Sequence, residues 1–154
     1  MSFTLEIDER AFMAQIERFA ADIVAGTRGA VEETCSEAAA HARAVGQFQD
    51  QTGALRKSIV GRVVRRDAHG TSGTIEATAP HAGYVEAGTE PHLIRPRIAR
   101  ALRWEEGGEV RFARVVRHPG TRARPFMGPA AIKAEGLLYA KMQIVAARAI
   151  ERAS

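Results

Sequence analysis

The chain has few of the residues that mark secreted, membrane-spanning or disulfide-bonded proteins. Its 154 residues include one cysteine, Cys35, so no disulfide can form within the chain. No run approaches the roughly 20 apolar residues that a membrane-spanning helix requires. The first residues carry acids where a signal peptide carries bases. We therefore expect no membrane contact, and a protein made and kept in the cytoplasm unless it leaves as part of a larger assembly.

Aromatic residues are also scarce, at 6% of the chain, so the core must depend mainly on Ala, Val, Ile and Leu. The hydrophobic content of 45% is ordinary for a globular protein and argues against disorder along most of the chain. The length suits one domain over residues 1–154. The net charge of +4, carried mostly by arginine, fits a nucleic-acid partner or an arginine-rich interface and does not decide between them.

Apolar residues recur at helical spacing in two long stretches. The first predicts one helix from a cap at Asp8 to about Val45, bent or broken near Gly26 and Gly29, with Cys35 as a small buried residue. The second predicts a helix from about Ala130 to Arg152 that begins after Pro129. Its expected apolar stripe comprises Leu137, Leu138, Met142, Val145, Ala149 and Ile150.

Alternating residues and turn signals between these helices predict two β-hairpins. The first pairs Ile59–Arg66 with Thr71–Thr78, and the second pairs Ala101–Trp104 with Glu109–Arg117. Phe3–Ile7 is a further short strand or extended arm. The predicted fold class is α+β: a small antiparallel sheet of two β-hairpins packed with a long N-terminal and a long C-terminal helix.

Signals for catalysis are weak. His81, His92, His118 and Glu86 could imitate a metal set, but their spacings match no known finger-like or helix-borne site. The favoured interpretation is that each histidine serves its turn through a backbone hydrogen bond. No nucleophile elbow, phosphate-binding glycine loop or zinc-protease motif is present. We expect no catalytic residue, metal or cofactor; a small hydrolase using Glu86 and His81 is the remaining enzymatic alternative.

Three segments stand out from this plain pattern: Thr52–Ile59, Tyr84–Thr89 and His118–Met127. In the first, Thr52 is predicted to cap one helical turn that delivers Leu55 to the core and Arg56 and Lys57 to solvent.

The second and third segments each join a Gly-Thr turn to an aromatic residue. Tyr84 and Val85 are expected to point inward, and Gly88 to end a short helix in a conformation that other residues resist. Glu86 is expected to form an ion pair with an arginine.

In their order, these segments resemble the tail-completion, or neck, proteins of long-tailed bacteriophages and prophages. That family has a Thr-Gly-x-Leu-x-x-Ser turn, a Tyr-x-x-Glu-x-Gly-Thr turn and a Pro-Phe before the last helix; Ala87 replaces its usual large apolar residue. The residues that carry the resemblance are Thr52, Gly53, Leu55, Ser58, Tyr84, Glu86, Gly88, Thr89, His118, Pro119, Gly120, Pro125 and Phe126.

The resemblance implies a non-catalytic virion protein that assembles in the host cytoplasm. Such proteins form a ring, expected to be hexameric, around the DNA channel at the head-proximal end of the tail. They contact the head connector and the tail tube or terminator proteins.

Charged residues between the second and third segments, and within the third, are candidate interface residues. They are expected to pair with a neighbouring subunit or the connector, to make non-specific contact with DNA, or to form a solvated basic face. The alternative function is a small basic nucleic-acid-binding protein. The candidates are Arg95, Arg97, Arg100, Arg103, Glu105, Glu106, Arg122 and Arg124.

Overall fold

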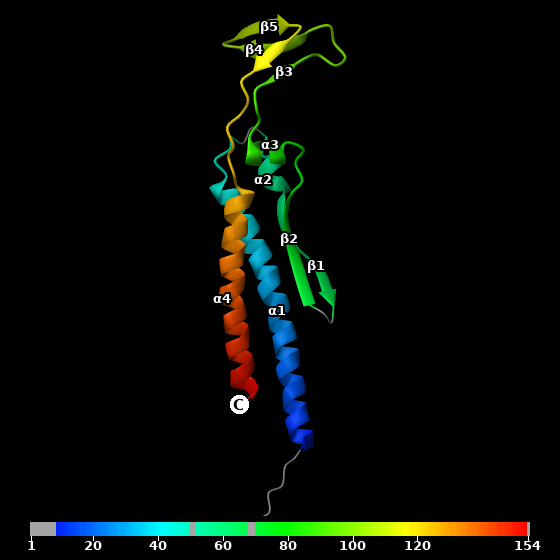
Figure 1. Cartoon of the computed structure of the whole chain (residues 1–154), viewed down its shortest axis with the longest axis vertical. Helices are drawn as coiled ribbons and strands as arrows, with labels where there is room; N and C mark the ends of the chain where they lie inside the picture. Colours follow the sequence, from blue (N-terminus) through cyan, green and yellow to red (C-terminus); the bar gives the residue numbers. More distant parts are fainter. Residues whose placement is uncertain (1–8, 50–51, 68–69, 154) are drawn as a thin grey trace, which may run out of the picture.

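The computed structural model describes residues 9–49, 52–67 and 70–153. Two long helices lie side by side along an elongated molecule: α1, Glu9–Val45, and α4, Met127–Ala153 (Figure 1). A β-hairpin lies along α1, and smaller strand pairs project beyond the end of the helices where α4 begins (Figure 1). Among the described residues, no helix is long and apolar enough to cross a lipid bilayer. The predicted cap at Asp8 and the strand at Phe3–Ile7 lie outside the described residues.

Helix α1 runs without interruption for 37 residues, so it is not broken near its glycines. A Cβ atom at Gly26 would lie 2.5 Å from Val145 Cγ1, whereas one at Gly29 would meet nothing within 4 Å. Gly26 therefore lets α4 approach α1 closely, and packing against α4 offsets the low helix propensity of glycine.

The hairpin consists of β1, Ile59–Asp67, and β2, Gly70–Ala77, with Ile59 opposite Ala77 and a bulge near Val64. Its backbone packs directly on α1 at Cys35. A Cβ atom at Gly61 would lie 2.0 Å from the Cys35 carbonyl oxygen, and one at Gly73 would lie 2.2 Å from its Sγ atom. Cys35 is buried, as expected, and burial raises the pKa of its thiol.

The core lies where the C-terminal end of α1 meets the start of α4. Phe126 is fully buried and packs edge-on against Phe48, with ring centroids 5.2 Å apart. Leu55 from α2, Ala54–Ser58, and Ala82 from α3, Ala82–Ala87, close the same cluster. Each of the three sequence motifs, or the helix that carries it, therefore contributes to one apolar cluster.

The predicted α+β class is confirmed, with long terminal helices and small antiparallel strand pairs. The strands nevertheless form three separate two-stranded sheets instead of one. Strand β4, Leu102–Glu106, pairs with β5, Glu109–Ala113. The predicted return strand then breaks, and β6, Val116–His118, pairs with β3, His92–Ile94. The chain must return to α4 beside the point where it left α3, which brings β3 and β6 together.

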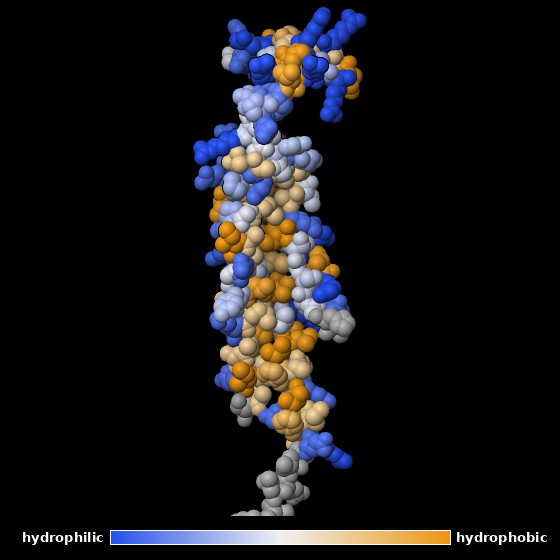
Figure 2. All heavy atoms as spheres, viewed as in Figure 1, coloured by the Kyte–Doolittle hydropathy of each residue, from blue (hydrophilic) through white to orange (hydrophobic). Residues whose placement is uncertain are grey.

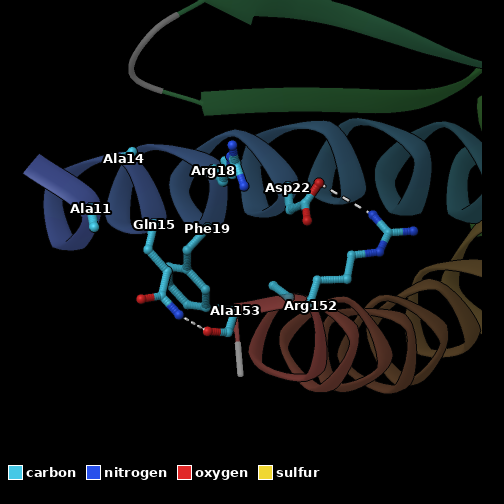
Figure 3. Close-up of a pocket in the computed structure, with 9 residues that line it drawn as sticks. Ala11, Ala14, Gln15, Arg18, Phe19, Asp22, Arg152 and Ala153 are labelled. Carbon is cyan, nitrogen blue, oxygen red and sulfur yellow. Dashed lines mark hydrogen bonds and ion pairs between the residues drawn. The ribbon is translucent and has the colours of Figure 1, made fainter.

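The C-terminal end of α4 is held against α1 by polar contacts. At its C-terminal end, Arg152 pairs with Asp22 at 3.2 Å, and the Gln15 side-chain amide donates to the Ala153 carbonyl (Figure 3). Beyond this point α1 continues alone (Figure 1). Ala149 is buried, but the predicted inward position of Ile150 is wrong because that side chain is mostly exposed.

The close approach at Cys35 generates a test. We expect Gly61→Ala to destabilise the fold by about 3 kcal/mol, because its methyl group would overlap the α1 backbone. Gly29→Ala is the control on α1 and should stabilise by about 0.5–1 kcal/mol. Urea unfolding followed by circular dichroism measures both. Equal stability of the two variants would contradict direct backbone packing at Gly61.

Candidate functional site

The Glu86 carboxylate caps helix α4 from a different helix. Phe126 and Met127 donate their backbone N–H groups to Glu86 Oε2 at 2.7 and 2.9 Å, and Gly128 donates to Oε1 at 2.9 Å. The first amides of a helix have no partner within it, and its N-terminus favours negative charge. Glu86 therefore does what an N-cap residue does, from a position 40 residues before Phe126.

These contacts decide the acidity of Glu86. Burial raises the pKa of the carboxyl, but the three backbone hydrogen bonds outweigh burial and hold the pKa below its usual value. The expected arginine partner is wrong, since the carboxylate is held by backbone amides.

The two Gly-Thr turns that echo one another in the sequence pair with each other in space. Thr89 donates its N–H to the Thr121 carbonyl at 2.8 Å, and Thr121 donates back to the Thr89 carbonyl at 3.0 Å. Arg124 adds a third backbone bond, to the Val85 carbonyl at 2.9 Å. We call these bonds and the Glu86 cap the clamp; together they join the end of α3 to the start of α4.

Both glycines of the clamp are required by its geometry. Gly88 has φ +73° and Gly120 has φ +90°, in the region that side chains disfavour. A Cβ atom at Gly88 would lie 2.5 Å from the Thr121 carbonyl oxygen, and one at Gly120 would lie 2.3 Å from that of Thr89. Each glycine thus leaves room for the other turn.

Two of the histidines act within the turns, as expected. The Gly120 N–H donates to His118 Nδ1 at 3.1 Å, and His92 Nδ1 lies 2.9 Å from the Glu90 carbonyl. Their rings stack with centroids 5.0 Å apart. Within the described part of the chain, no three His, Cys, Asp or Glu residues are grouped so as to hold a metal ion.

The first motif, Thr52–Ile59, forms hydrogen bonds within its own turn and contributes Leu55 to the core. The Ala54 N–H donates to Thr52 Oγ1 at 3.3 Å, with Gly53 between them, and Ser58 Oγ donates to the Leu55 carbonyl at 2.8 Å. Thr52 thus acts one residue before the cap position, and Leu55 is buried as predicted.

The predicted solvent position is correct for Lys57 and wrong for Arg56. Arg56 donates to the Arg43 and Gly46 carbonyls, and its guanidinium carbon lies 4.7 Å from the centroid of the Phe48 ring. An arginine is needed here because one guanidinium can reach two carbonyls and still cover an aromatic face.

The aromatic residues of the other motifs behave differently. Phe126 is buried in the core, while Tyr84 is 65% exposed, so its predicted inward position is wrong. Val85, its neighbour on α3, packs against the core instead. Pro119 and Pro125 lie exposed on either side of the second Gly-Thr turn.

The candidate interface residues all have exposed side chains and lie on or beside a projection that we call the arm, residues 90–120. The arm carries β3 to β6 (Figure 1). Arg122 and Arg124 lie beside its root at the clamp. The members on the arm itself are Arg95, Arg97, Arg100, Arg103, Glu105 and Glu106.

Glu86, Gly88 and Gly120 all serve backbone contacts, which defines an architectural joint. A comparison with protein families matches residues 10–88, just over half of the chain, to HK97-gp10_like, described as "Bacteriophage HK97-gp10, putative tail-component". The chain therefore belongs to the HK97-gp10-like family and is a structural component of a phage tail. Neither the curated proteins nor the solved structures gave a match.

The crowded glycine of the clamp leads to one prediction. Gly88→Val should destabilise the fold by about 3 kcal/mol or more, since it combines a disfavoured φ with a clash against the opposite turn. Gly83→Val on α3 is the control, because a Cβ atom there meets nothing within 4 Å. Thermal unfolding measures both. A Gly88→Val protein as stable as its control would contradict the role given to this glycine.

The Glu86 cap of α4 leads to a second prediction. Glu86→Gln should cost about 2 kcal/mol at neutral pH, because a neutral amide binds the three N–H groups less strongly. The lowered folded-state pKa means that the carboxylate stabilises the fold above its unfolded pKa of about 4.3, and that this stability is lost as pH falls through the folded value. Urea unfolding at a series of pH values down to about 3 should show a weaker acid loss in Glu86→Gln.

Glu90→Gln is the matched control for this experiment, since Glu90 contributes only its backbone carbonyl to the turn. It should keep the wild-type pH profile. A Glu86→Gln profile that matches the wild type would refute the cap as a source of the pH dependence.

Proposed function

We propose that this tail component completes the head-proximal end of the tail, as a ring of copies around the DNA channel that joins the tail to the head connector. Family membership supports a structural tail role. The observation that carries the ring is the apolar surface that one chain leaves uncovered on its two long helices (Figure 2).

Helix α4 presents one such surface on the side turned away from α1. Ile132 is 76% exposed and Tyr139 69%, and Ile150 is also exposed. Their spacings of 7 and 11 residues place them on one side of the helix. Gly136 lies on the same side with open space where a Cβ atom would be, which leaves room for a side chain from another molecule.

Helix α1 presents the other surface near its N-terminal end. Phe12, Met13 and Ile16 are exposed there, and Val24, further along α1, is exposed as well. A helix gains most of its stability from packing of its apolar side, so we expect this end of α1 to pack against another molecule.

Two different apolar surfaces on one chain suit a head-to-tail contact. The α1 end of one copy packs on the outer side of α4 of the next, and such a contact generates a ring if its rotation closes. Six copies is the number that the family resemblance implies. The arm would then contact the neck proteins, with its arginines and with Glu105 and Glu106.

The chain's two tyrosines provide a matched test. Tyr139→Arg should convert the ring to monomers, because it places a charge in the middle of the proposed contact. Tyr84→Arg, at an equally exposed tyrosine outside that contact, should still assemble. Mass photometry of the purified proteins measures the oligomer, and circular dichroism confirms that both variants are folded.

A lysate from a phage that lacks the gene tests the neck role separately. Added wild-type protein and Tyr84→Arg should restore joining of heads and tails, and Tyr139→Arg should not. A wild-type protein that is monomeric and also fails to restore joining would rule out the proposed function.

A further inference from the structure

The arm is built without a core of its own. All of residues 90–120 are described, and none of them is buried. Their backbone pairs only two strands at a time, β3 with β6 and β4 with β5. Isolated two-stranded pairs are marginally stable in water. The clamp holds the arm at its root through the Thr89–Thr121 pair, so the arm is oriented by the body and completed by something outside it.

Exposed apolar side chains are interleaved with the arginines of the arm. Ile98 is fully exposed at 102%, and it follows Arg97 directly; Phe112, likewise exposed, follows Arg111. Leu93, Val110 and Val115 are also exposed. Figure 2 shows hydrophobic patches set among the hydrophilic residues at this end of the molecule. A partner must therefore offer apolar contact as well as charge.

The arm also accounts for most of the chain's net positive charge. It contains seven arginines and four glutamates, a net +3 of the chain's +4. Arg111 is paired with Glu106 at 3.0 Å. Arg95, Arg97 and Arg100 form no ion pair among the described residues, so a partner surface rich in carboxylates would match them.

A second copy of this chain is a poor match for this requirement, because the chain itself is basic, with a net charge of +4. On α1, Glu32 pairs with Arg66 at 2.8 Å, Glu33 and Glu37 pair with Lys141, and Asp22 pairs with Arg152. Four of the acids on α1 are thus already engaged within their own chain. The partner is a different protein.

We propose that the arm docks on another protein whose surface combines carboxylates with an apolar recess that receives Ile98 and Phe112. Duplex DNA would pair with the arginines, but its outer surface of phosphates offers no counterpart for these two side chains. The inference rests on the proposed function for the place of the partner in the phage particle. The chemistry of the partner's surface is inferred from the arm alone.

Labelled peptides of matched charge test this chemistry. One alternates Glu and Leu, the other alternates Glu and Ser, and a short DNA duplex is the third probe. Fluorescence anisotropy with the full chain should show the Glu-Leu peptide binding about tenfold more tightly than the Glu-Ser peptide, as expected for burial of two apolar side chains. The duplex should bind more weakly than the Glu-Leu peptide at the same salt concentration.

Variants locate the binding on the arm. Ile98→Ser with Phe112→Ser should remove the tenfold preference and leave Glu-Ser binding unchanged. Arg97→Ser with Arg100→Ser should weaken both peptides. The control, Ile144→Ser, changes a half-exposed isoleucine of α4 and should bind like the wild type. All variants should keep the wild-type oligomer in mass photometry, so a failed ring and a failed arm give different results.

Three outcomes would overturn the proposal. One is equal or undetectable binding of the two peptides. Another is tighter binding to the duplex that is insensitive to Ile98→Ser with Phe112→Ser, which would make the arm a DNA contact. The last is loss of the oligomer in the arm variants, which would make the arm a contact between copies.

Discussion

The contact between the Glu86 carboxylate and the first turn of α4 supports most of the structure. It satisfies three backbone amides with one partly buried charge, which no residue next to α4 in the sequence provides. The same contact fixes Phe126 beside Phe48 in the core. Because α3 and α4 are joined there, the segments that lead into and out of the arm are also brought together, at Thr89 and Thr121.

This joint divides the molecule into two parts with different demands. On one side, the long helices and the hairpin pack closely through small residues such as Gly26 and Gly61. On the other, the arm has strands and charge but no buried residue. A rigid body with uncovered apolar sides and an incomplete arm is what a component of a larger assembly requires, and it agrees with membership of a phage tail family.

Much of the fold and part of the joint could be predicted from local patterns. Helical periodicity located α1 and α4, and turn residues located the first hairpin and Gly88. Several of the predictions that were wrong concern the side on which a residue lies. Tyr84 was expected to be buried because it is aromatic, and Arg56 to be exposed because it is charged. Tyr84 is instead exposed, and Arg56 contacts Arg43 and Phe48, which lie outside its own helix.

The sequence by itself determined the element types, the α+β class and the need for glycine at Gly88, because propensities and left-handed conformations act over a few residues. Only the tertiary structure decided that the turns pair with each other and that Glu86 caps α4. It also decided that the return strand of the second predicted hairpin is interrupted, so that its last part, β6, pairs with β3 in the arm. Those features depend on contacts across 30 to 40 residues of chain, and no local pattern specifies which partners such contacts join.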